Sequence, residues 1–105
     1  MLKNFEKYIF TFKSNKDYKF CWLAFPLLLK SKDKNIRTSL QLFLERKGIQ
    51  TRTIFSGNIT RQPVSKLFKW KSKGSLKNSD LVMEKGILLG CHQKVTFSKI
   101  NYLES

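Results

Sequence analysis

The residues best suited to bind a ligand lie in one stretch, residues 51–63, with the sequence TRTIFSGNITRQP. Arg52 and Arg61 are two of only four arginines in a chain that has 17 lysines. A guanidinium grips a phosphate or carboxylate through two parallel hydrogen bonds, whereas an ammonium acts as a point charge. Asn58 and Gln62 add amide donors and acceptors for hydroxyls or a base edge. The stretch predicts an anion site, and the plainer reading, in which the arginines are only exposed, stays equally open.

A tight turn is expected at the centre of this stretch. Gly57 permits backbone conformations that are closed to residues with a β-carbon, and Asn58 tolerates the left-handed region. Such a turn, placed after a strand, leaves Arg52 and Arg61 on its two sides, where they can converge on one anion.

No other pattern for catalysis or metal binding is present. The chain has no HExxH, GxSxG or P-loop motif, and its seven acidic residues are spread out. Cys21 and Cys91 lie far apart in apolar surroundings, which predicts buried free thiols rather than a zinc or redox site. His92 is the single histidine and has no partners for a metal. We therefore expect neither catalytic nor metal-binding residues.

Length and charge limit the class of protein. A chain of 105 residues with 41% hydrophobic residues predicts one globular domain with a modest core. The net charge of +14 is typical of proteins that bind nucleic acid, and this function has to be considered. Lysines scattered over a whole chain, however, more often form a solvated surface. No apolar run reaches the ~18 residues of a membrane span, and no signal cleavage site follows the longest run. A cytoplasmic protein without membrane contact is expected.

Periodicity divides the chain into a lead-in segment, residues 1–18, and a single small domain, residues 19–105. Helical spacing links Phe5, Tyr8, Ile9 and Phe12 in the lead-in segment, which suggests a short helix. The elements expected in the domain are a strand within 19–30, a helix carrying Ile36, Leu40, Phe43 and Leu44, a strand within 49–54, a loop at 55–63, a helix capped by Asn78 or Ser79 and ended by Gly86, a strand at 87–91, and a helix with Phe97, Ile100 and Leu103.

Several residues mark the ends of these elements. Asp33 or Asn35 is expected to cap the first helix, and Gly48 suits the left-handed residue just past its end. Thr96 should open the last helix. Pro26 implies that the first strand lies at a sheet edge or bends. The order of elements predicts an α/β (α+β) fold, an open sheet with helices on one face.

Residues 51–63, together with the three residues before them, resemble a family signature. Residues 48–63, GIQTRTIFSGNITRQP, resemble the GI-x-TR-x-x-F-x-GN-x-x-RQP pattern of the DegT/DnrJ/EryC1/StrS aminotransferase family of pyridoxal-phosphate-dependent enzymes. The resemblance is strongest to CDP-4-keto-6-deoxyglucose 3-dehydrases and similar lipopolysaccharide-sugar dehydratases. Flanking segments agree in order and spacing over residues 20–105: WLAFPL at 22–27, the helix at 37–48, NSDLVMEKG at 78–86 and LGCH at 89–92.

The resemblance implies the small C-terminal domain of a fold-type I transferase, with a short, mostly antiparallel sheet and helices on one face. It places the cofactor-binding lysine, or the histidine that replaces it in dehydrases, in a large domain that this chain lacks. Pyridoxal 5'-phosphate or pyridoxamine 5'-phosphate would then belong to the complete enzyme and is not expected on this chain alone. His92 has a doubtful role, because Gln93 and Lys94 replace the family's Pro-Gly. The residues implied to contact a nucleotide-sugar are Arg52, Phe55, Gly57, Asn58, Arg61 and Gln62.

The expected function is that of a C-terminal domain or fragment of a nucleotide-sugar 3-dehydrase or aminotransferase of lipopolysaccharide (O-antigen) deoxysugar biosynthesis. It would supply nucleotide-sugar contacts to a separate or missing large domain and would be inactive alone. The sequence leaves open which sugar is bound, whether the reaction is dehydration or transamination, and whether the chain forms a homodimer. It also leaves open whether the chain is a natural protein, a gene remnant or an excised domain. The alternative is a small basic nucleic-acid-binding protein, suggested by aromatic residues among lysines: Phe5, Tyr8, Phe68 and Trp70.

Overall fold

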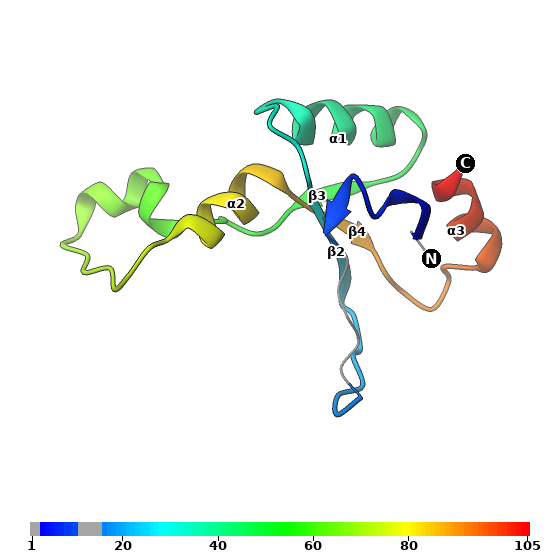
Figure 1. Ribbon diagram of the computed structural model, residues 1–105, viewed down its shortest axis with the longest axis horizontal. Helices are drawn as coiled ribbons and strands as arrows, with labels where there is room; N and C mark the ends of the chain where they lie inside the picture. Colours follow the sequence, from blue (N-terminus) through cyan, green and yellow to red (C-terminus); the bar gives the residue numbers. More distant parts are fainter. Residues whose placement is uncertain (1–2, 11–15) are drawn as a thin grey trace.

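The computed structural model describes residues 3–10 and 16–105, which form one antiparallel sheet with helices around it (Figure 1). The strand order among these residues is β1-β2-β4-β3, and every neighbouring pair is antiparallel. This confirms the predicted fold class. The elements are η1 Lys3–Phe5, β1 Ile9–Phe10, β2 Ala24–Leu29, α1 Ile36–Arg46, β3 Thr51–Thr53, η2 Ile59–Arg61, η3 Pro63–Leu67, α2 Lys77–Lys85, β4 Gly86–Gly90 and α3 Phe97–Glu104, where η marks a 3₁₀ helix.

The core lies between one face of the sheet and α1. Leu27 of β2 pairs with Ile87 of β4, and Leu29 pairs with Ile9 of β1. Side chains alternate between the faces of a sheet, so these residues share one face. Figure 1 shows α1 lying along this side of the sheet. The buried apolar residues of the described chain are Ile9, Leu27, Leu29, Leu44, Ile87 and Leu89, and Ile36, Leu40 and Leu103 pack against them.

Helix α1 ends as the sequence predicts. Gly48 has a φ of +76°, and its N–H donates to the carbonyl of Glu45 at 3.0 Å. The N–H of Ile49 donates to the carbonyl of Leu44 at 2.9 Å. These two bonds form a Schellman motif, which satisfies carbonyls that the helix leaves free.

The predicted helix starts are less accurate. Asn35 occupies the N-cap position of α1, but its side chain makes no capping bond; Asp33 Oδ1 instead accepts from the Asn35 N–H at 2.8 Å. Helix α2 begins at Lys77 with Leu76 before it, so the cap by Asn78 or Ser79 is wrong. Thr96 does cap α3, accepting from the N–H of Lys99 at 3.4 Å. Two predicted face residues, Phe43 and Phe97, are exposed.

The lead-in segment and the first strand also differ from expectation. A helix through Phe5, Tyr8 and Ile9 is wrong, because the chain forms η1 and then β1, whereas Phe12 lies outside the described residues. Pro26 lies in β2, which stands between β1 and β4 in the sheet order, so an edge position for the strand is wrong and the alternative, a bend at Pro26, stays a prediction. In the described chain β1 pairs only with the far end of β2, at Leu28 and Leu29.

The expectation of buried thiols also fails. Cys21 is exposed and Cys91 is half-buried, and both are free. Cys21 precedes β2, outside the sheet, whereas Cys91 follows the last residue of β4. An apolar sequence context therefore did not place either side chain in the core.

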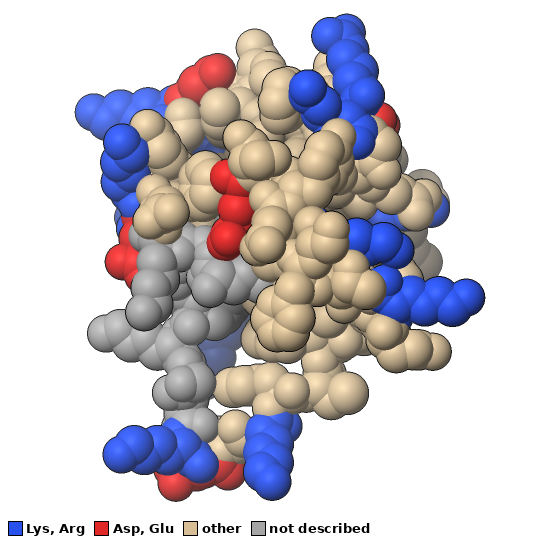
Figure 2. Space-filling view, turned by 90° about the vertical axis from the view of Figure 1, so that its right-hand side faces the viewer, with Lys and Arg blue, Asp and Glu red and all other residues tan. Residues whose placement is uncertain are grey.

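Charge is unevenly distributed over the surface. Figure 2 shows the face at the α3 end of the molecule, where most visible atoms belong to uncharged residues and Lys and Arg lie mainly around the rim. Such a face is unusual for a chain with a net charge of +14. Most Lys and Arg atoms in this view therefore lie around the rim, whereas some Asp and Glu atoms appear nearer its centre.

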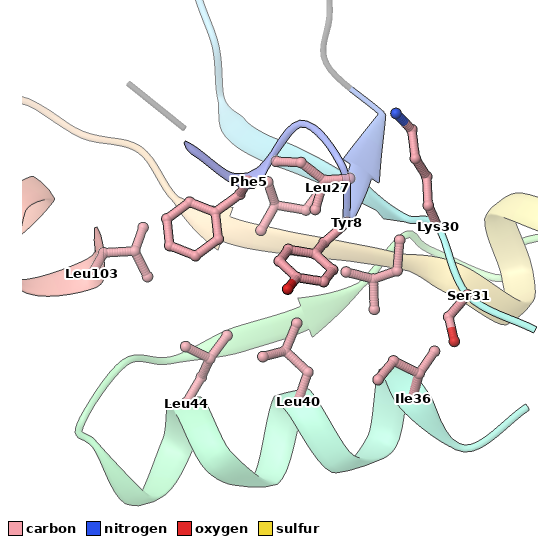
Figure 3. A pocket seen from close by; sticks show the side chains of 11 residues that line it. Phe5, Tyr8, Leu27, Lys30, Ser31, Ile36, Leu40, Leu44 and Leu103 are labelled. Carbon is pink, nitrogen blue, oxygen red and sulfur yellow. The ribbon is translucent and has the colours of Figure 1, made fainter. Parts of the chain in front are cut away.

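An apolar cavity of about 610 Å³ opens between the sheet, α1 and α3. Leu40 and Leu44 point into it from α1, Leu103 enters from α3, and Phe5 and Tyr8 form the opposite wall (Figure 3). Polar groups are few here: Lys30 and Ser31 lie at one end. The described chain therefore leaves part of its core open.

Candidate functional site

The candidate site is built on the loop between β3 and η2. Phe55 has a φ of +45°, which is rare for a bulky residue, and Gly57 has a φ of +63°. The N–H of Gly57 donates to the carbonyl of Ile54 at 3.0 Å and closes the turn. A β-carbon on Gly57 would lie 2.4 Å from Cβ of Met83. The turn predicted from Gly57 and Asn58 is present, and only glycine fits at its closest approach to α2.

Asn58 holds the far side of the turn. Its side chain is buried, with 3% exposure of the residue. Its Oδ1 accepts from the N–H of Thr60 at 3.1 Å and from the Thr60 hydroxyl at 2.8 Å, which caps η2. Its Nδ2 donates to Oδ1 of Asp80 at 2.7 Å. The amide of Asn58 therefore bonds within the protein.

Asp80 of α2 connects this loop to the rest of the domain. Arg61 donates from Nε to Oδ1 at 3.1 Å and from Nη2 to Oδ2 at 3.0 Å, a two-pronged ion pair. The hydrogen bond from Arg61, and then that from Asn58, lower the pKa of Asp80. The same pairing raises the pKa of Arg61. The Arg61 side chain is still 60% exposed, so its remaining N–H groups face solvent.

A small cavity of about 200 Å³ lies beside the turn. Phe55, Gly57 and Gln62 line it, together with Arg37 of α1 and Met83 of α2. Arg37 donates from Nη1 to the carbonyl of Met83, and Gln62 donates from Nε2 to the carbonyl of Ser56 at 2.7 Å. Three of the predicted site residues, Phe55, Gly57 and Gln62, thus line one cavity with Arg37, an arginine that the sequence did not predict as a site residue. Its position at the start of an amphipathic helix gave no sign that it would reach the loop.

Arg52 and Arg61, the two arginines of residues 51–63, do not line a common cavity. Arg52 is exposed in β3 and lines a separate cavity of about 420 Å³ with Glu45, Gly48 and Gln50. Arg61 is held at Asp80 and lines neither this cavity nor the one beside Arg37. A single anion gripped by Arg52 and Arg61 therefore does not match this arrangement, and their contact with a nucleotide-sugar stays a prediction.

His92 is exposed in a turn, where its Nδ1 accepts from the N–H of Lys94 at 3.2 Å. Within residues 3–10 and 16–105, no three His, Cys, Asp or Glu side chains gather as a metal site would require. No helix in that part of the chain has the length and hydropathy to cross a membrane.

Comparison with known proteins identifies the class. The DegT/DnrJ/EryC1/StrS aminotransferase family matches residues 1–103, so the chain belongs to this family. In solved structures it is similar to a GDP-4-keto-6-deoxymannose-3-dehydratase crystallised with a trapped PLP-glutamate geminal diamine. The TM-score is 0.78 at 27% identity, and the match covers 97% of this chain and 27% of that one. The resemblance inferred from the signature is confirmed.

Curated relatives point the same way. The chain is 33% identical over 84 residues to lipopolysaccharide biosynthesis protein RfbH of Salmonella typhimurium. It is 32% identical over 82 residues to dTDP-4-dehydro-2,6-dideoxy-D-glucose 3-dehydratase of Saccharopolyspora spinosa. A GDP-4-keto-6-deoxy-D-mannose 3-dehydratase of Escherichia coli O55:H7 is 30% identical over 83 residues. These matches cover 80%, 78% and 78% of this chain but only 19%, 18% and 21% of the relatives, about a fifth of their length.

The residues around the loop do not fit pyridoxal phosphate by themselves. Asp80, the acid at this loop, is held by Arg61 and Asn58 and so is not free to pair with the pyridine nitrogen of the cofactor. Lys85 is buried and donates its ammonium to the carbonyl of Asp33, so it is not presented to a cofactor. The described residues of this loop therefore do not form a cofactor cradle by themselves.

Proposed function

We propose that this chain acts as the small domain of a pyridoxal-phosphate- or pyridoxamine-phosphate-dependent nucleotide-sugar 3-dehydratase or aminotransferase of lipopolysaccharide deoxysugar synthesis. The observation that carries the proposal is the loop at residues 54–63, a rigid turn locked to α2 within a chain of this family. The loop forms one wall of the substrate site. A large domain outside these 105 residues binds the cofactor and supplies the chemistry.

The residues of the loop divide into two groups under this proposal. Arg37, Phe55 and Gln62 face the cavity and contact the sugar or its phosphates. Gly57 and Asn58 shape the loop. Arg61 both shapes the loop and contacts the ligand. Two of its five N–H groups donate to Asp80, which leaves three for the ligand. Arg52 contributes a second cation at the edge strand.

The strain at Phe55 supports a role in ligand contact. Its φ of +45° disfavours a bulky side chain, yet the residue is 84% exposed and gains little burial in return. Strain of about 1–3 kcal/mol at an exposed residue is typical of positions where function sets the geometry. Under the proposal the ring lies against the substrate when the domain closes.

The open core supports a covering domain. The apolar cavity of about 610 Å³ and the largely uncharged face of Figure 2 lie at the same end of the molecule, near α3. Burial of apolar surface favours association by roughly 25 cal/mol per Å². The relatives are about five times as long as their match to this chain, so they have ample chain to cover this end. A cytoplasmic location is part of the same proposal.

A domain exchange tests the proposal. The segment of GDP-4-keto-6-deoxymannose-3-dehydratase that matches this chain is replaced by residues 1–105, and cofactor absorbance, KM and kcat for its own substrate are measured. The chimera should bind the cofactor and show activity. Arg37→Gln, which removes the cation from the cavity, should raise KM about tenfold or more with a smaller change in kcat.

A matched arginine separates a ligand contact from general charge loss. Arg46→Gln removes the same charge at the other end of α1, away from the loop cavity, and should leave KM within about twofold. A chimera that folds and binds cofactor, but whose KM is unchanged by Arg37→Gln, Arg52→Ala and Arg61→Ala alike, would contradict the assigned contacts.

A further inference from the structure

The segment from η3 to the first turn of α2 carries a positive charge that the proposed function does not use. Residues 64–79 contain five lysines and no acidic residue. In Figure 1 this part of the chain projects from one end of the molecule, away from α1 and α3. One nucleotide-sugar with two phosphates needs far less positive charge than this. We call residues 66–77 the basic arm.

Two aromatic rings are exposed on the basic arm. Phe68 is 61% exposed and Trp70 is 50% exposed, although both are among the most apolar side chains. Their ring centroids are 5.8 Å apart at 71°, an edge-to-face pair that fixes one ring against the other. Lysines flank them in the sequence KLFKWKSK. Exposed rings between cations provide stacking surfaces for bases next to contacts for phosphates.

Trp70 borders a cavity of about 360 Å³ at the root of the arm. Lys71 and Lys73 line it with the hydroxyl-bearing residues Thr60, Ser72 and Ser79, as do residues 57–59 of the loop. No carboxylate is among its lining residues. The size falls within the ~300–1,000 Å³ of pockets that bind small ligands or single nucleotides.

The nearest acid does not cancel this positive charge. Asp80 follows Ser79 in α2, but its carboxylate is paired in two-pronged fashion with Arg61. Stacking surface, cations and a cavity without acids are therefore adjacent. We propose that the basic arm binds single-stranded nucleic acid, with one base stacked on Trp70 and the neighbouring phosphates at Lys71 and Lys73.

Binding of a labelled oligothymidylate of about 20 nucleotides, which has little structure of its own, tests this. The full chain is titrated while anisotropy is followed between about 50 and 200 mM salt. The triple variant Lys69→Gln, Lys71→Gln, Lys73→Gln should bind about tenfold or more weakly, and its log–log salt slope should fall by about 2. The matched control changes three exposed lysines elsewhere to glutamine, Lys16, Lys19 and Lys32, and should stay within about threefold.

Tryptophan fluorescence tests the proposed stacking of a base on Trp70 separately. Trp22→Phe leaves Trp70 as the only tryptophan, and its fluorescence should be quenched by the oligonucleotide. Trp70→Ala should weaken binding by about 5- to 100-fold. Phe97→Ala, which removes an exposed ring from α3, should leave binding nearly unchanged.

Three results would overturn the proposal: no binding at about 50 mM salt, equal losses in the two triple-lysine variants, or competition by thymidine diphosphate at the same concentration as the oligonucleotide. The last would indicate a pocket for free nucleotides. The domain exchange described above gives a separate result, because Arg37, Phe55 and Gln62 line the cavity beside the turn and do not line the cavity of the arm.

Discussion

Asp80 is the residue that fixes the candidate site. It accepts from Arg61 and Asn58, residues 19 and 22 positions earlier in the chain, and so ties the loop to α2. The sequence alone predicted the turn, because Gly57 and Asn58 have strong local preferences. It did not predict that Arg61 and Asn58 would bond to Asp80. That pairing depends on how α2 packs, which no local pattern encodes.

The ion pair predicts a particular dependence on pH. The pKa of Asp80 lies below 3.8 in the folded chain, so its contribution is present above about pH 3.8 and is lost as the pH falls through the folded value. Asp80→Asn should therefore lower the free energy of unfolding at pH 7, and the difference from the native chain should shrink below about pH 3.8. Chemical unfolding measured from pH 7 to pH 2 checks this.

Glu84→Gln provides the control, because it removes the same charge one turn further along α2 on an exposed residue. Its effect should be small at every pH. If the curves of Asp80→Asn and the native chain ran parallel down to pH 2, the pair would not be the source of the difference.

Alanine substitutions at Gly48 and Gly57 distinguish the cost of backbone strain from the cost of a steric clash. Both have positive φ, but a β-carbon on Gly48 meets nothing within 4 Å, whereas on Gly57 it meets Met83 at 2.4 Å. Gly48→Ala should reduce stability by about 1 kcal/mol, and Gly57→Ala by about 1–3 kcal/mol more. Urea unfolding measures both. Equal losses would mean that the loop does not press against α2 as described.

At the scale of elements, the sequence predicted best where the signals are local. The end of α1 follows from Gly48, and the start of α3 follows from Thr96. The helix predicted in the lead-in segment is wrong, because a strand of two residues has almost no sequence pattern of its own. Strand β1 forms because Ile9 pairs with Leu29 across the sheet and enters the core, a contact between distant residues.

Strand β3 is held to α1 by a buried threonine. Thr51 donates from its hydroxyl to Oε1 of Glu45 at 3.1 Å and accepts from Nε2 of Gln41 at 3.2 Å. Thr51→Val keeps the shape but leaves both partners without this bond, so it should reduce stability by about 1–2 kcal/mol. Thr53→Val, at an exposed position of the same strand, should change little. Thermal unfolding of the two variants compares them, and equal effects would contradict this role for Thr51.

At the scale of the whole molecule, the open cavity predicts where a second domain binds. Leu103 lies at this cavity, and Leu67 is exposed on η3 at the other end of the molecule. The remaining four-fifths of the E. coli relative, prepared without its matching segment, should bind this chain. Leu103→Gln should weaken that binding about tenfold or more, and Leu67→Gln about twofold or less, as titration calorimetry would show. If Leu67→Gln weakened binding more than Leu103→Gln, the interface would lie elsewhere. Circular dichroism verifies that both variants fold.

The most direct measurement is activity restored by the separate chain. The truncated relative is assayed for conversion of GDP-4-keto-6-deoxy-D-mannose with increasing amounts of this protein, beside a parallel titration with the relative's own missing segment. The account predicts that activity rises and saturates with this chain, and that Arg37→Gln shifts the KM for the sugar nucleotide. If the relative's own segment restores activity while this chain binds and restores none, the chain does not form a working wall of the substrate site.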